Sequence, residues 1–233
     1  MADPTEYVFK LDSSGRPAMF PIPEKVVSNI HWFNTNRASN RIFHSVDGIE
    51  GVVIHATAGG STSGALTWWR GTPPNGAKAS AHWIVPDEDE TAHGNHVWAV
   101  VYETLAAWHV RNSATSPEID NKKKINHWTL GIEIVNRQND SDTFSDWQYE
   151  VTALLVRYCW AKYPNMKYVF SHALVDPSRR SDPGDEFDWT RFEALVRSSD
   201  NDPAVDEEAE NLLLAMDTEN VPTAYLANKS CCM

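Results

Sequence analysis

Residues 130–163 constrain the fold of this 233-residue chain most, because a strand pattern is followed there by a helix pattern with defined ends. The first six residues are apolar except for one acid, which is typical of a buried strand. Ser145 and Gln148 then fit a capping box at the start of a helix over 146–163, and Pro164 follows the helix. Apolar side chains recur at helical spacing within it, at Val151, Leu154, Leu155, Tyr158 and Cys159.

Further strand-like and helix-like segments alternate along the chain. Ser61 can cap a short helix that Gly71 ends, and Asp188 can cap another that runs to about residue 197. Strand patterns occur at 51–55, 81–85, 97–102 and 130–135. Strands interspersed with helices predict an α/β fold, in which a central mixed sheet is flanked by α-helices.

The composition divides the chain into three parts. Residues 1–48 mix Pro, Ser and Asn with isolated aromatic residues, which predicts an irregular N-terminal arm packed on the core. Residues 49–200 carry the strand and helix patterns and are long enough for one folded domain. Residues 201–233 hold a net charge of −6, and 203–216 read as a helix with acidic residues in its first turn.

Charge and hydropathy exclude several classes of function. A net charge of −12 argues against a protein that binds nucleic acid through its phosphates or attaches broadly to anionic lipid. No signal-peptide pattern and no apolar run of membrane-spanning length is present, so we expect synthesis in the cytoplasm and no membrane span. Cys159, Cys231 and Cys232 give no disulfide framework, and the last two are expected in an unstructured tail.

Three residues from distant segments have the composition of a metal site. His55 ends the apolar run 51–55, while His172 and Asp182 lie ten residues apart much later in the chain. A catalytic zinc ion typically takes three protein ligands of these types and keeps one position for water. The alternative is that these are ordinary surface or core residues, since the chain has nine histidines.

Two charged residues are candidates for work beside such a metal. Glu133 is the single charge in an apolar strand, where an unpaired carboxylate is costly. Glu133 is therefore either a general acid and base next to the metal or a residue on a strand face that is wet. Arg180 stands two residues before Asp182 and can stabilise an oxyanion, unless Arg179 and Arg180 are a plain surface pair.

Five segments together resemble a known family in order and spacing. The resemblance is to the zinc-dependent N-acetylmuramoyl-L-alanine amidases of the type-2 amidase superfamily, which also holds phage lysozyme-type amidases and peptidoglycan recognition proteins. It covers roughly residues 50–198. The segments are Val53-Ile-His55-Ala-Thr-Ala58, Ala79-Ser-Ala-His82-Trp83, Ala107-Trp-His109, Thr129-Leu-Gly-Ile-Glu133-Ile-Val-Asn136 and Arg180-Ser-Asp182-Pro-Gly184.

The resemblance implies a role for each of the residues singled out above. His55, His172 and Asp182 would bind one zinc ion per chain, and Glu133 would be the catalytic acid and base. Arg180 stands where many members have lysine, and arginine keeps the charge but cannot donate a proton at neutral pH. Other branches have cysteine as third ligand or tyrosine at the position of Ala81, so the chain looks closer to the bacterial branch that uses aspartate and glutamate.

Aromatic and imidazole side chains are candidates for contact with substrate. His82 and His109 are expected to line the groove or to support the ligands, and Trp83 and Trp108 can offer flat faces to a sugar. A packed or solvent-facing position is the alternative for each histidine, and tryptophans in a small domain are more often part of the core.

The function implied is hydrolysis of the amide between N-acetylmuramic acid and the L-alanine of peptidoglycan or muropeptides. The alternative is a recognition protein that binds muropeptide without cutting it. The expected partner is this substrate, with no nucleic acid, and the sequence assigns no oligomeric state. Without a signal peptide, a wall-degrading role of the endolysin kind requires release or dedicated export, whereas recycling of imported fragments does not.

Overall fold

The computed structural model describes residues 6–20, 31–32, 37–42, 46–71, 78–94 and 96–198. The predicted helix at 203–216 and the two terminal cysteines lie outside the described residues. Within them, no helix is long and apolar enough to cross a membrane.

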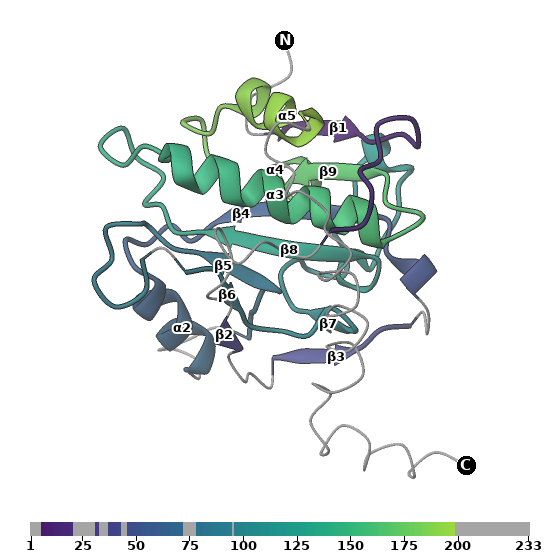
Figure 1. Ribbon diagram of the computed structural model, residues 1–233. Helices are drawn as coiled ribbons and strands as arrows, with labels where there is room; N and C mark the ends of the chain where they lie inside the picture. The colour runs from purple at the N-terminus through teal and green to yellow at the C-terminus, as the bar shows by residue number, and fades with distance from the viewer. Residues whose placement is uncertain are drawn as a thin grey trace.

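A mixed sheet forms the centre of the described structure, as the strand and helix pattern predicts (Figure 1). The central strands β9, β4, β8 and β5 run parallel to one another, and β1 and β6 add antiparallel neighbours. In spatial order the strands are β1 (Val8–Lys10), β9 (Tyr168–Ser171), β4 (Gly51–Ala56), β8 (Thr129–Ile134), β5 (Trp83–Val85), β6 (Trp98–Ala99) and β2 (His31–Trp32). A separate pair joins β3 (Ala38–Asn40) to β7 (Leu105–Ala107).

Four α-helices are described around this sheet, and three of them, α2, α3 and α5, begin at the caps predicted from the sequence. Ser145 and Gln148 form the capping box of α3, which ends two residues before Pro164. Ser61 and Asp188 accept backbone hydrogen bonds at the starts of α2 and α5. The helices are α2 (Thr62–Arg70), α3 (Asp146–Lys162), α4 (His172–Val175) and α5 (Trp189–Arg197). Short 3-10 turns occupy Val46–Gly48, Pro117–Ile119 and Ile125–His127.

The two faces of the sheet pack against different partners. Alternate side chains of β4 and β8, such as Ile54 and Ile132, join a core with α3 and α5, which lie over the same face (Figure 1). Val53 points the opposite way into a second cluster. Since side chains alternate along a strand, His55 and Glu133 lie on the face away from α3.

Parallel pairing brings the carboxyl ends of three strands to one edge of the sheet. The register places His55 of β4 directly opposite Glu133 of β8. On the other side of β4, β9 ends at Ser171 and the next residue, His172, begins α4. Ligands of open α/β sheets gather at such an edge, so the sheet itself assembles candidate residues from distant segments.

Two predicted strands are shorter in the structure than in the sequence pattern. The expected strands at 81–85 and 97–102 reduce to Trp83–Val85 and Trp98–Ala99. The backbone N–H groups of Val100 and Val101 both donate to the carbonyl of His82, so regular pairing ends there. The predicted N-terminal arm also contributes strand β1, and Phe9 and Leu11 are buried in the core.

Candidate metal centre

The three predicted ligands meet at one point of the carboxyl edge. Nδ1 of His55 lies 3.0 Å from Nδ1 of His172, and each of these atoms lies 3.0 Å from Oδ2 of Asp182. All three residues are buried. Among the described residues, this is the group of histidines, cysteines and carboxylates whose ligand atoms converge closely enough to hold a metal ion.

The shape of this triangle fits a zinc ion. Zinc with nitrogen and oxygen bonds in tetrahedral geometry needs ligand atoms about 3.3 Å apart, close to the spacing observed. Two imidazoles and one carboxylate also match the ligand types of catalytic zinc sites, which keep a fourth position open. The spacing of the ligand atoms and the ligand types therefore both suit a zinc ion.

The protonation states of the ligands suit a cation. Burial, followed by the nearby charge of His172, lowers the pKa of His55 to about 4, so this ring is neutral at pH 7. Burial alone would raise the pKa of Asp182, but the polar contacts of its carboxylate with the His172 and His55 side chains hold the pKa below its usual range. The carboxylate is therefore ionised, and the site offers a negative charge and a neutral ring.

The loop that carries Asp182 is fixed to the short helix α4. The backbone N–H of Ala173 donates to the carbonyl of Asp182 at 3.1 Å, and the N–H groups of Arg179 and Arg180 donate to the carbonyl of Asp176. The buried Asp176 carboxylate also pairs with the guanidinium groups of Arg111 and Arg179. These bonds return the chain after α4 so that Asp182 faces the histidine with which α4 begins.

Glu133 lies beside the three candidate ligands. Its Oε2 is 3.8 Å from Nδ1 of His55, and its side chain is 17% exposed. Burial and the negative charge of Asp182 raise the pKa of Glu133 to about 8, although Arg180 opposes this shift. Without a cation, the carboxyl group therefore holds a proton at neutral pH, which is a suitable range for a group that exchanges protons.

The ligands open onto a cavity of about 360 Å³. Glu133 and Arg180 line it, and Arg180 is exposed there. Helix α2 supplies Trp68, a residue that is 48% exposed, and Glu90 fixes the start of this helix by accepting from the N–H and hydroxyl of Thr62. An exposed aromatic face beside a polar floor is suited to the apolar face of a sugar.

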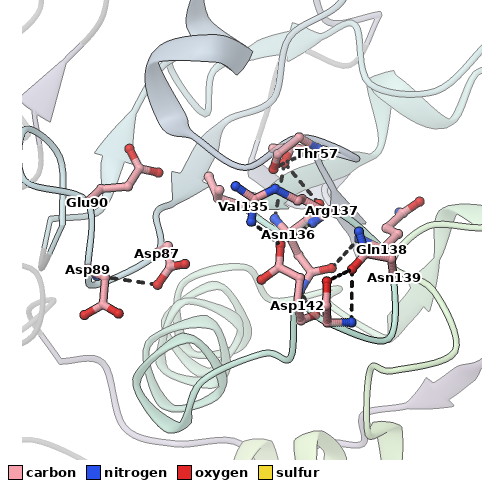
Figure 2. Close-up of polar contacts among 12 residues, drawn as sticks. Thr57, Asp87, Asp89, Glu90, Val135, Asn136, Arg137, Gln138, Asn139 and Asp142 are labelled. Atoms are coloured by element: carbon pink, nitrogen blue, oxygen red, sulfur yellow. Dashed lines mark hydrogen bonds and ion pairs between the residues drawn. The ribbon is translucent and has the colours of Figure 1, made fainter.

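The rim of the cavity is held by a polar network between the ends of β4 and β8, shown in Figure 2. The Thr57 hydroxyl donates to the carbonyl of Gly59 at 2.7 Å and accepts from the N–H of Asn136. Asn136 in turn accepts from the N–H of Gln138 and donates to the carbonyl of Asp142. Thr57 and Gln138 line the cavity but were not singled out from the sequence, although both closely follow strands that carry site residues.

Of the four residues expected near substrate, one lines the cavity. His109 lines the cavity, and its Nδ1 lies 3.0 Å from Nε2 of His55. His82 is fully buried, bonded to the N–H of Gly131 and the carbonyl of Leu105, and Trp83 is in the core. Because neither lines the cavity, we correct their expected role from substrate contact to support of the sheet.

Trp108 occupies an intermediate position. It is half-buried and lines a second cavity of about 240 Å³, together with Arg111, Asn126 and His127. It does not line the cavity that contains the metal ligands. Contact between Trp108 and substrate remains a prediction.

An α/β fold with two histidines and an aspartate at the carboxyl edge of its mixed sheet is typical of metal-dependent enzymes. Sequence comparison identifies the family. The family model described as N-acetylmuramoyl-L-alanine amidase matches residues 45–185, and the chain belongs to this family. The match contains all three ligands, Glu133 and Arg180.

Individual relatives agree with this assignment. The chain is 34% identical over 94 residues to the 1,6-anhydro-N-acetylmuramyl-L-alanine amidase AmpD of Salmonella typhimurium, covering 40% of this chain and 47% of the relative. It is 29% identical over 153 residues to the amidase AmiD of Escherichia coli, covering 62% and 52%. The chain thus spans about half the length of the curated relatives it matches.

Solved structures show the same fold. A crystal structure of an AmpD selenomethionine derivative aligns with a TM-score of 0.58 at 21% identity, covering 75% of this chain and 98% of that one. AmiD from E. coli, in complex with the substrate anhydro-N-acetylmuramic acid-L-Ala-D-γ-Glu-L-Lys, aligns with a TM-score of 0.52 at 25% identity, covering 72% and 63%.

Removal of a ligand should abolish metal binding without unfolding the chain. We expect His55→Ala, His172→Ala and Asp182→Ala each to lose bound zinc, measured by elemental analysis, while keeping the circular dichroism spectrum of the parent. His93→Ala, which alters a histidine outside the cluster, is the control and should retain the ion. Full zinc content in all three ligand variants would show that the assigned site is wrong.

Metal binding should also release a proton from Glu133. Its pKa of about 8 lies above pH 7, so the carboxyl is mostly protonated before metal binding, and a nearby cation favours the ionised form. We expect Glu133→Gln to release about one proton fewer per zinc ion at pH 7, and the difference to disappear above pH 9. Calorimetry in buffers of different ionisation enthalpy measures this number, and equal proton release at pH 7 would contradict the assignment.

Proposed function

We propose that this protein hydrolyses the amide between N-acetylmuramic acid and L-alanine in peptidoglycan or muropeptides, with one zinc ion per chain. One observation carries the proposal: three buried ligand atoms, mutually 3.0 Å apart, open onto a cavity beside Glu133. Membership of the amidase family and the fold shared with a substrate-bound AmiD support the choice of substrate.

His55, His172 and Asp182 would hold the ion and set its position at the cavity floor. When bound, zinc supplies Lewis acidity, which polarises a carbonyl and acidifies water. Glu133 is placed to take the proton of the attacking water and then to deliver it to the leaving nitrogen of L-alanine. A bound cation favours the ionised form of Glu133, which is the form that accepts the proton from water, and the protonated form then serves as the acid.

Arg180 has a separate role in the proposed reaction. Its guanidinium lines the cavity and acts electrostatically on Glu133 and His55. A permanent positive charge at this position stabilises the oxyanion that develops on the scissile carbonyl. Because a guanidinium does not lose its proton at neutral pH, proton transfer is left to Glu133.

The alternative, a recognition protein that binds without cutting, differs in its chemistry and not in its fold. Binding alone requires neither a complete ligand set nor an acid with its pKa near neutrality. In this chain His55, His172 and Asp182 converge closely enough to hold an ion, and Glu133 lies opposite His55 in the paired strand with its pKa raised. This combination favours an enzyme over a recognition protein.

Cleavage of defined substrates tests the function. The zinc-loaded chain, incubated with purified sacculi and with soluble anhydro-muropeptide, should release peptides with new amino-terminal alanine, and chelation should stop the release. Glu133→Gln is the matched control, which should bind zinc but cleave at least about 100-fold more slowly. Binding of both substrates by the zinc-loaded parent without cleavage would instead establish a recognition protein, and the preferred substrate separates wall lysis from recycling.

Substitution of Arg180 tests the oxyanion role. We expect Arg180→Ala to lower kcat about 100- to 1,000-fold, the usual effect of losing one oxyanion donor, with zinc content unchanged. Arg180→Lys keeps the charge and should retain most of the activity. If the alanine variant keeps the parental kcat, Arg180 has no part in the chemical step.

A further inference from the structure

A series of hydrogen bonds extends from the candidate metal site into the protein interior behind it. Nε2 of His55 lies 3.0 Å from Nδ1 of His109, and Nε2 of His109 lies 3.3 Å from the hydroxyl of Thr129. That hydroxyl donates to the backbone carbonyl of Ile125 at 2.8 Å. This series of hydrogen bonds therefore ends on the Ile125 carbonyl, which can accept hydrogen bonds but cannot donate them.

The carbonyl at the end of this series fixes which atom donates in each of its hydrogen bonds. A hydroxyl has one hydrogen, so Thr129 must accept from Nε2–H of His109. A neutral imidazole with a proton on Nε2 has a bare Nδ1, which accepts from Nε2–H of His55. His55 then presents its bare Nδ1 to His172 and Asp182, as a metal ligand requires.

We propose that Thr129 and His109 form a relay that fixes the tautomer of His55 and thereby prepares its Nδ1 for the metal ion. This inference rests on one part of the proposed function, the metal site, and does not require that the protein cleaves an amide. His109 is a positioning residue here, because it acts through His55. Partners of this kind behind a metal ligand typically change metal affinity 10- to 100-fold.

The strand β8 provides the space and the bonds for this relay. Thr129, Gly131 and Glu133 are every second residue of β8 and therefore lie on the same face, which carries the site. A Cβ on Gly131 would lie 2.7 Å from Cγ and 2.8 Å from Nδ1 of His109, so glycine leaves room for the ring. The N–H of Gly131 donates to Nδ1 of His82, whose ring lies edge-on to that of His109.

Because the relay is buried, loss of one of its hydrogen bonds is costly. Thr129 is fully buried and His109 is 8% exposed, so water does not readily replace a lost partner. Without the hydroxyl, the His109 tautomer that supports metal binding would leave a buried N–H unpaired. The other tautomer would place Nδ1–H of His109 against Nε2–H of His55.

Two substitutions of Thr129 separate the hydroxyl from the shape of the side chain. Thr129→Val keeps the shape and removes the hydroxyl, whereas Thr129→Ser keeps the hydroxyl and removes a methyl group. We expect Thr129→Val to weaken zinc binding 10- to 100-fold in competition with a chromophoric chelator, and Thr129→Ser to stay within about threefold of the parent. Gly131→Ala, which displaces the His109 ring, should weaken zinc binding as Thr129→Val does.

Nitrogen-15 spectra of the zinc-loaded parent give a readout that general loosening of the fold does not change. His109 should carry its proton on Nε2, and His55 should carry a proton on Nε2 with zinc on Nδ1. A proton on Nδ1 of His109, or equal zinc affinity in Thr129→Val and Thr129→Ser, would overturn the relay. A zinc-loaded chain that fits this pattern but cleaves no muropeptide would refute the proposed function and leave the relay standing.

Discussion

The parallel pairing of β4 with β8 and β9 is the constraint on which the site depends. It brings His55, Glu133 and His172 to one edge of the sheet, although the two histidines are 117 residues apart in sequence. The helices α3 and α5 cover the opposite face and exclude water from the core. The sheet can therefore hold a rigid polar site on one face because the other face is packed with apolar side chains.

The sequence predicts the parts of this structure that depend on local chemistry. The capping box of Ser145 and Gln148 sets the start of α3, and the apolar pattern around Glu133 gives the buried strand that carries it. The three ligands could also be selected from sequence, because two imidazoles and an aspartate in motifs of the correct order are an unusual combination. Their convergence at 3.0 Å depends on strand register, which only the structure supplies.

Other site residues could not be assigned from sequence because their orientation depends on tertiary contacts. His82 and Trp83 stand in a motif that resembles the amidase family, yet both side chains are buried, His82 against Gly131 and Trp83 in the core. His109 was expected at the groove, but its bond to His55 requires the absence of a side chain at Gly131. The tautomer of a histidine follows from such partners and leaves no trace in residue spacing.

The alternation of β8 has a consequence for how this protein can change over time. A one-residue shift in the pairing register of β8 would turn Thr129, Gly131 and Glu133 together into the apolar core and turn Leu130 and Ile132 toward the site. The proposed acid and base Glu133, the space for an imidazole at Gly131 and the hydroxyl of Thr129 thus depend on a single pairing register of β8. Evolution can vary the bulk of the apolar positions one at a time, but it can shift the polar ones only as a set.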